Sequence, residues 1–396
     1  MLIIVNHNNF MITCIERNAN TEISAGEDEV VVKLFGIIRE HLRTLKRPLA
    51  ESLFALFIGL LIGATLMLVF GHNPITGYIS MLKGFGLFIR EVSFNQTEFL
   101  EALAYSVPLT LTAITFAVGM RAGIFNIGAE GQVYMGAVAA AWIGGHLVLP
   151  TGIHVLVATA FAMLVGALWA LLPAILKIFA GVHEVISSIM LNWIAFFHVP
   201  YLIIHHFAGA YAERTAAVLP TARYPVIGAS LTAVIFVAIA ACVVVYFLLW
   251  RTRAGYELRL VGDNPDAARY AGVNIRRAIL ISFIIGGLAA GLAGASQVIG
   301  RPLLGWTLPA TLGTVFGLGF SGIGVAVVGR NHPIGGIFAA LLFAGMLNGA
   351  KFMEYDYGIP SDLVVAIQGV IILALAVPTL LPMIRKGVKK IGRRPK

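Results

Sequence analysis

The chain is dominated by long apolar stretches that short polar segments separate. About ten of these stretches approach the ~20 residues that a helix needs to cross the hydrocarbon core of a bilayer. They lie near residues 50–70, 102–119, 130–149, 153–177, 184–206, 229–250, 278–299, 310–329, 334–350 and 363–382. Charged residues make up only 12% of the chain, about half the share of a soluble domain. The sequence therefore predicts an all-α polytopic membrane protein and argues against a soluble enzyme.

The basic residues predict the orientation of these spans. With the amino terminus inside and ten spans, all but six of the 28 Lys and Arg residues fall on the cytoplasmic side. The six outside are Lys83, Arg90, Arg214, Arg223, Arg301 and Lys351. Cytoplasmic loops are enriched in Lys and Arg, so we expect both termini in the cytoplasm. The basic residues behind the net charge of +9 then lie next to anionic membrane lipids and cytoplasmic partners, which argues against nucleic acid as a ligand.

Composition divides the chain into four parts. Residues 1–29 are polar and predict a disordered cytoplasmic tail, and residues 30–47 read either as an amphipathic juxtamembrane helix or as a simple linker. Residues 48–384 form the predicted transmembrane domain, with a long charged cytoplasmic loop at 252–277, and residues 385–396 form a basic cytoplasmic tail.

The order of the spans suggests internal symmetry. Spans two to five and seven to ten can be laid over one another, with the sixth between them. Each half contains a glycine-interrupted segment, at residues 121–131 and at residues 313–324. A shift of five spans reverses the direction through the membrane, so the pattern predicts an inverted repeat, which is common in transporters.

A polar motif lies between the second and third spans. The segment Met120 to Gln132 places Asn126, Glu130 and Gln132 among three glycines. Polar groups at membrane depth are costly unless they face protein or water, so we expect these three residues to line a substrate pathway. Glu130 alone has a second interpretation, as an acid that stabilises the start of the third span through the helix dipole.

A second polar motif opens the fifth span. Ser188 and Asn192 are four residues apart, so they share one face of a helix. Such a stripe either lines a pathway or joins helices by hydrogen bonds. Of the two interpretations we carry the pathway forward, with Asn192 deeper in the span than Glu184.

The cytoplasmic loop 252–277 holds the pattern of a short capped helix. Pro265 suits the first turn of a helix, Asn264 suits its N-cap, and Gly272 suits the position beyond its end. A short helix in a charged loop between two repeats predicts a docking element for a soluble partner, against the alternative of an ordinary polar connection. The residues that we assign to docking are Gly262, Asn264, Pro265, Ala267, Ala268, Arg269 and Gly272.

These motifs together resemble one known family. The run Pro108 to Gln132, the segment Gly71-His-Asn-Pro74, the segment Glu184 to Asn192 and the segment Gly319 to Gly329 look like the permease subunit of bacterial ABC importers for nucleosides. That subunit belongs to the branched-chain amino acid and simple-sugar permease family. The resemblance covers roughly residues 50–385. Two positions depart from it: His183, where the family pattern has Asn, and Ser321, where it has a carboxylate.

The resemblance implies a subunit of the bacterial inner membrane that performs no chemistry on its substrate and holds neither cofactor nor metal. It implies an ATPase with two nucleotide-binding domains, a lipid-anchored or periplasmic substrate-binding protein and a second, paralogous permease as partners. The Pro265–Ala271 helix would then be the coupling helix. The sequence contains no Gly-Lys pair, so another chain must bind the ATP. The alternatives are a permease for ribose-like sugars and an ion-coupled secondary transporter.

Overall fold

Helices make up nearly all of the regular structure in the computed structural model, which describes residues 52–89, 91–209 and 213–376. The predicted tail 1–29, the juxtamembrane segment 30–47, the basic tail 385–396 and the end of the last predicted span lie outside these residues. The longer described helices are Ser52–Val69, α3 (Gln96–Arg121), α4 (Ala129–His146), α5 (Ile153–Ala180), α6 (Glu184–His206), α7 (Val234–Arg251), α10 (Ile275–Val298), α12 (Pro333–Tyr357) and α13 (Asp362–Ala376).

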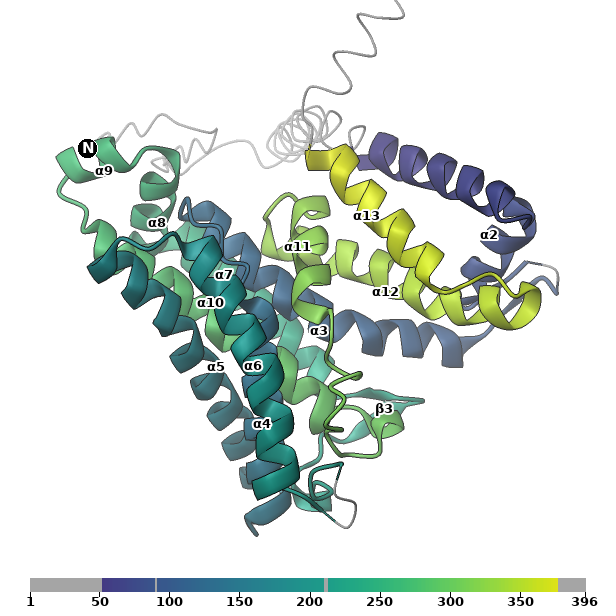
Figure 1. Ribbon diagram of the computed structural model, residues 1–396, viewed down its shortest axis with the longest axis horizontal. Coiled ribbons are helices and arrows are strands. Elements are labelled where there is room, and N and C mark those ends of the chain that lie inside the picture. The colour runs from purple at the N-terminus through teal and green to yellow at the C-terminus, as the bar shows by residue number, and fades with distance from the viewer. Residues whose placement is uncertain (1–51, 90, 210–212, 377–396) are drawn as a thin grey trace, which may run out of the picture. The chain divides into compact units, whose positions relative to one another are not determined.

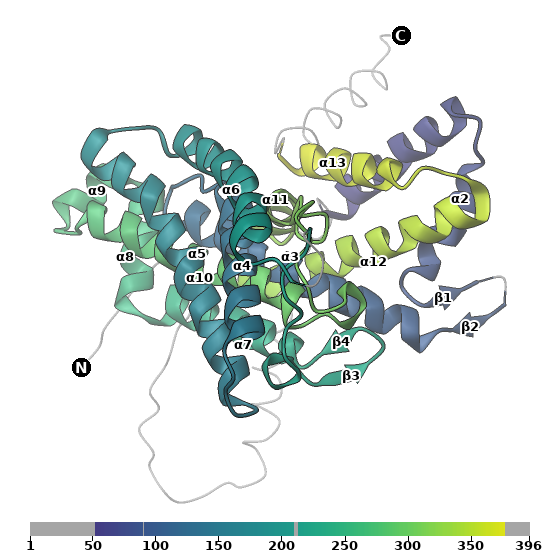
Figure 2. The same cartoon turned by 60° about the horizontal axis from the view of Figure 1, so that its bottom comes forward.

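Shorter elements connect these helices. They are the helices α2 (Pro74–Lys83), α8 (Arg253–Asp263), α9 (Pro265–Tyr270) and α11 (Leu318–Val328), and the 3-10 turns η1 (Pro220–Ala222) and η2 (Pro302–Leu304). Strands β1 (Leu87–Phe88) and β2 (Ser93–Phe94) form one antiparallel hairpin, with Leu87 opposite Phe94. Strands β3 (Val226–Gly228) and β4 (Leu231–Thr232) form a second one (Figure 2).

The described helices agree with most of the predicted spans. Seven of them are long and apolar enough to cross a membrane, and the fifth predicted span, 184–206, matches the bounds of α6. Helices α4, α11 and α13 fall on three further predicted spans. The prediction for residues 310–329 is wrong in its first half, because helix begins only at Leu318 and the residues before it form turns. The count of ten spans therefore stays a prediction.

Helix α10 lies at the centre of the largest core and packs most extensively on α5 and α4 (Figure 1). Glycines make this contact close. A Cβ atom on Gly291 would meet the Ala162 carbonyl oxygen and lie 2.9 Å from the Met163 Cα on α5, and one on Gly287 would lie 2.6 Å from the Ala167 Cα. Gly287 and Gly291 are therefore points of contact between α10 and α5. Small residues at these positions let the two backbones touch.

Replacing Gly291 by alanine should destabilise the protein by about 1–3 kcal/mol, because the obstructing atoms are backbone and cannot rotate away. A matched control is Gly369→Ala on α13, where an added Cβ would meet nothing within 4 Å. Thermal unfolding in detergent should show a lower midpoint for the Gly291 variant alone. Equal midpoints for the two variants would contradict the close contact.

Two further apolar cores involve α12. One joins α12 to α3 and α11 and contains Phe116, Val325 and Phe343. The other joins α12 to the Ser52–Val69 helix, α2 and α13 through residues such as Met67 and Ile367. Helix α11 therefore packs against both α3 and α12, and these two contacts limit how α11 can move.

Candidate functional site

Buried polar atoms gather around the turn that joins α3 to α4. Asn126, Gln132 and Ser188 are each at most 1% exposed, and Trp169 of α5 lies close by. The Asn126 Oδ1 accepts a hydrogen bond from the Gly128 backbone N–H at 3.0 Å. The Asn126 Nδ2, the Gln132 Oε1, the Ser188 Oγ and the Trp169 Nε1 find no hydrogen-bond partner among the described residues. Unpaired buried polar groups are rare in native proteins, so this cluster is a candidate ligand-binding site.

Glycines bring the cluster together. A Cβ atom on Gly128 would lie 2.9 Å from the Gln132 Nε2, 3.1 Å from the Asn126 Oδ1 and 3.4 Å from the Ser188 Cβ. The start of α4, the turn before it and α6 therefore meet at this glycine. The structure thus brings together three of the predicted pathway residues, Asn126, Gln132 and Ser188.

Asn192 has a different environment from Ser188, although both lie on the same face of α6. Its Oδ1 accepts a hydrogen bond from the Gly131 N–H at 2.9 Å, and its Nδ2 donates one to the Ile127 carbonyl at 3.0 Å. Both halves of the amide are therefore occupied in joining α6 to the start of α4. This geometry favours the helix-joining interpretation of Asn192.

Replacing Asn192 by alanine should lower the stability of the protein by about 1–3 kcal/mol, because the Gly131 N–H would remain buried without a partner and the half-buried Ile127 carbonyl would lose its donor. Ser188→Ala serves as the matched control one turn away, since its hydroxyl makes no hydrogen bond in the described structure. Thermal unfolding of both variants in the same detergent measures the difference. A Ser188→Ala variant as destabilised as Asn192→Ala would contradict the assignment.

Glu130 contacts the second glycine-interrupted segment of the chain. Its carboxylate, on a side chain 2% exposed, accepts hydrogen bonds from the Tyr134 hydroxyl and from the backbone N–H groups of Gly317, Gly319 (2.6 Å) and Phe320 (3.2 Å). The segments 121–131 and 313–324, which the sequence sets in corresponding positions, therefore meet through this side chain. A carboxylate at the start of both α4 and α11 complements the positive ends of two helices.

Arg121 lies at the other end of the same motif. Its Nε donates to the Asn331 carbonyl at 3.1 Å and its Nη2 to the Arg330 carbonyl at 3.2 Å, both just beyond the end of α11. Its guanidinium group also lies 5.4 Å from the centre of the Trp250 ring. Burial, together with this guanidinium group, holds the pKa of the neighbouring His332 below its usual value.

The predicted docking loop folds as expected. The Asn264 Oδ1 accepts hydrogen bonds from the Asp266 and Ala267 N–H groups, and Pro265 begins α9. Gly272 follows with a φ of 79°. Figure 1 shows α8 and α9 together at one end of the helical bundle.

The residues that we assigned to docking have different exposures. Ala268 is fully buried, and the backbone of Gly262 packs against Arg121 and Gly123. These two residues hold the loop in place. Arg269 is exposed, and Tyr270, which the sequence analysis did not select, is 95% exposed. Asn264, Pro265, Ala267 and Gly272 are exposed as well, so most of the assigned residues lie on the surface of the loop.

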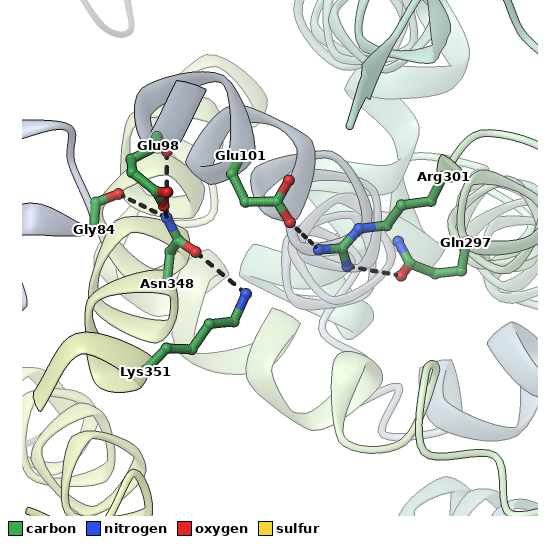
Figure 3. Close-up of polar contacts among 7 residues, drawn as sticks. All are labelled: Gly84, Glu98, Glu101, Gln297, Arg301, Asn348 and Lys351. Carbon is green, nitrogen blue, oxygen red and sulfur yellow. Dashed lines mark hydrogen bonds and ion pairs between the residues drawn. The ribbon is translucent and has the colours of Figure 1, made fainter. Parts of the chain in front are cut away.

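A second group of polar residues, missed in the sequence analysis, joins α3, α10 and α12 (Figure 3). Arg301 and Glu101 are 5% and 6% exposed, and the Arg301 Nη2 lies 2.9 Å from the Glu101 Oε1. Arg301 also donates to the Gln297 Oε1 at 3.3 Å. Its guanidinium carbon lies 3.6 Å from the centre of the Tyr105 ring, a cation–π contact.

The network continues toward α12. The Lys351 Nζ lies 4.6 Å from the centre of the same Tyr105 ring and donates to the Asn348 Oδ1. The Asn348 Nδ2 donates to the Glu98 Oε2 at 3.2 Å and to the Gly84 carbonyl (Figure 3). The sequence did carry a signal for this network, because Arg301 and Lys351 are two of the few basic residues on the predicted outer side. The acidic partner of Arg301, Glu101, lies 200 positions away in the chain.

Comparisons with known proteins agree with the membrane-spanning architecture. The profile of the family described as branched-chain amino acid transport system / permease component matches residues 98–376. The guanosine ABC transporter permease protein of Bacillus subtilis is 35% identical over 87% of this chain and 97% of its own length. The nucleoside ABC transporter permease protein of Lactococcus lactis is 33% identical over 87% and 95%. The glucose ABC transporter permease protein of Haloferax volcanii is 30% identical over 83% and 87%. No solved structure is significantly similar to the chain.

Proposed function

The chain belongs to the permease-component family of branched-chain amino acid transport systems, and on that basis we propose that it is the membrane-spanning subunit of an ABC importer for nucleosides. The observation that carries this proposal is the similarity to the guanosine and nucleoside permeases, which extends over 87% of the chain. The family match over residues 98–376 includes both polar motifs and the loop 252–277. The subunit opens a path through the membrane and leaves its substrate chemically unchanged.

The energy comes from a partner. The sequence has no Gly-Lys pair for a phosphate-binding loop, so we assign ATP hydrolysis to a separate ATPase subunit that seats the α8–α9 loop. Closure of the ATPase dimer then shifts the permease between two conformations, because the two conformations bind the closed dimer with different affinity. A substrate-binding lipoprotein or periplasmic protein and a second, paralogous permease complete the proposed assembly.

The proposed substrate pathway passes the cluster around Gly128. Among the described residues, the donors Asn126 Nδ2 and Trp169 Nε1 and the acceptor Gln132 Oε1 have no partner, and the Ser188 hydroxyl can serve as donor or acceptor. A nucleobase edge and a ribose present both donors and acceptors, which matches this mixed set. Glu130 and Asn192 lie next to the cluster, but their side chains are hydrogen-bonded to other parts of the protein.

The placement in the membrane follows from the distribution of charge. We place the protein in the bacterial cytoplasmic membrane with both termini in the cytoplasm, ten spans and an inverted repeat of spans two to five and seven to ten. The Arg121 end of α3 and the α8–α9 loop then face the cytoplasm, and the network of Figure 3 lies toward the outer side. Two variants, each with a single cysteine in place of Arg253 or Tyr355, test this orientation when they are labelled with a membrane-impermeant maleimide. We expect only the Tyr355 position to react from outside, and the reverse result would overturn it.

Uptake of labelled guanosine by cells that carry or lack this chain tests the function. We expect uptake to require the chain and cellular ATP, and to survive a proton uncoupler while ATP is maintained. Loss of uptake with the uncoupler alone would favour the ion-coupled transporter.

A sugar permease is the second candidate function, because the glucose permease of Haloferax volcanii is 30% identical to this chain. Unlabelled glucose and ribose should fail to compete with labelled guanosine at a hundredfold excess, whereas unlabelled adenosine or inosine should compete. Competition by a sugar, together with chain-dependent uptake of that sugar, would replace nucleosides as the proposed substrate.

A further inference from the structure

Helix α11 is too short to cross a membrane by itself. Its 11 residues span roughly 16 Å at ~1.5 Å per residue, about half of a bilayer core of ~30 Å. The first turn of any helix has unpaired N–H groups and the last turn has unpaired carbonyls. At membrane depth these groups need partners from the protein itself. The partners of α11 therefore fix where it can lie.

A single motif contacts the start of α11 and the turn that follows its end. Within that turn, backbone N–H groups already pair with carbonyls of the last turn of α11. At the start of α11, the Glu130 carboxylate accepts hydrogen bonds from the backbone N–H groups of Gly317, Gly319 and Phe320. The Arg121 guanidinium donates to the carbonyls of Arg330 and Asn331 beyond its last turn. An acid at the N-terminus and a base at the C-terminus both complement the dipole of this helix.

The same motif is in backbone contact with the docking loop. A Cβ atom on Gly262, at the end of α8, would meet the Arg121 carbonyl oxygen and lie 2.9 Å from the Gly123 nitrogen. On the opposite side, a Cβ on Gly319 would lie 2.5 Å from the Glu130 Cα. The turn from Arg121 to Glu130 therefore touches α8 on one side and α11 on the other, with little room for independent movement.

We propose that Arg121 and Glu130 are positioning residues that hold the two ends of α11 against the α3–α4 turn. When the α8–α9 loop moves, the turn and α11 then move with it. This inference rests on the proposed function, since the movement originates at the ATPase. Glu130 then acts on transport through α11, without touching the nucleoside. The polar atoms of Asn126, Gln132 and Ser188 that have no partner in the described part of the chain remain available for the substrate.

Glu130→Gln and Arg121→Gln in the assembled transporter test the proposal. Both variants should lower the amount of guanosine taken up per ATP hydrolysed by about tenfold, the size of a typical coupling between two sites. The half-saturating guanosine concentration should stay within twofold of wild type, because no substrate contact is removed. Arg121→Lys, which keeps a cationic donor, should recover a large part of the loss. Glu354→Gln, an exposed acid on α12, is the matched control and should behave as wild type.

A distance measurement separates positioning from general damage. Spin labels are placed at Leu164 on α5 and at either Arg253 on α8 or Phe320 on α11, in a background in which Cys14 is serine and Cys242 is alanine. In the wild-type transporter, ATP should change both distances. In the Glu130→Gln and Arg121→Gln variants, ATP should change the α8 distance and leave the α11 distance unchanged.

Several results would overturn the proposal. They are an unchanged ratio of uptake to hydrolysis, a raised half-saturating concentration at an unchanged maximal rate, and an α11 distance that still responds to ATP in both variants. If Glu130→Gln does not assemble, the comparison of Arg121→Gln with Arg121→Lys decides the question. The proposed function is judged separately, because its failure would appear as absent guanosine uptake by the wild-type transporter in the same preparation.

Discussion

Replacing Glu101 by glutamine should lower the stability of the protein by about 3–5 kcal/mol, because the change leaves the Arg301 charge buried without its counter-charge. Both side chains are almost completely buried, and their ion pair is 2.9 Å long. Gln297 and the Tyr105 ring still contact Arg301 in the variant, but neither carries a negative charge. The expected measurement is a large drop in the thermal midpoint in detergent.

A double variant makes this prediction specific. Glu101→Gln with Arg301→Gln removes both charges, so it should be more stable than Glu101→Gln alone, since breaking a buried pair costs more than removing it. Glu91→Gln, at an exposed position near the start of α3, is the control and should have the wild-type midpoint. A double variant less stable than the single one would show that the ion pair is not the source of the loss.

Replacing Tyr270 by glutamate should abolish ATP-driven uptake while the protein still folds. An aromatic side chain that is 95% exposed carries little of the stability of the subunit, but such residues often dominate the binding energy of an interface. A loss of at least ~2 kcal/mol in binding, a typical value for a dominant interface residue, corresponds to about a thirtyfold weaker ATPase complex. Arg269→Glu should act in the same direction.

Tyr355 offers a matched control for this prediction. It is also an aromatic residue in a surface position, 91% exposed, but it lies near the far end of α12. Tyr355→Glu should retain the ATPase subunit in co-purification, whereas Tyr270→Glu should lose it. Normal co-purification and uptake in the Tyr270 variant would show that the α8–α9 loop does not use this residue for docking.

Much of the fold follows from local sequence patterns. The apolar stretch at 184–206 predicts α6 to the residue, and Asn264, Pro265 and Gly272 predict the cap, start and end of α9. These features depend on neighbours within a few positions. Local patterns fail at residues 310–317, which are apolar enough for a span but do not form a helix.

Local sequence patterns also fail to predict the hydrogen-bond partners of the site residues. Sequence spacing places Ser188 and Asn192 on one helix face, yet it cannot show that Asn192 is bonded to the α3–α4 turn while Ser188 is not. Glu101 and Arg301 are 200 positions apart, so no local pattern relates them. The partner of each charged side chain is decided by tertiary packing.

The glycine contact between α5 and α10 restricts which parts of the molecule can change shape. Where backbone meets backbone at Gly287 and Gly291, sliding either helix by one position would force a side chain into space that only a hydrogen atom now occupies. This pair therefore moves as one rigid body during any conformational cycle. Helix α12 meets α2 in the same way, because a Cβ atom on Gly349 would meet the Met81 carbonyl oxygen and lie 2.8 Å from the Met81 Cα. Relative movement in the molecule is therefore expected between these helix pairs rather than within either of them.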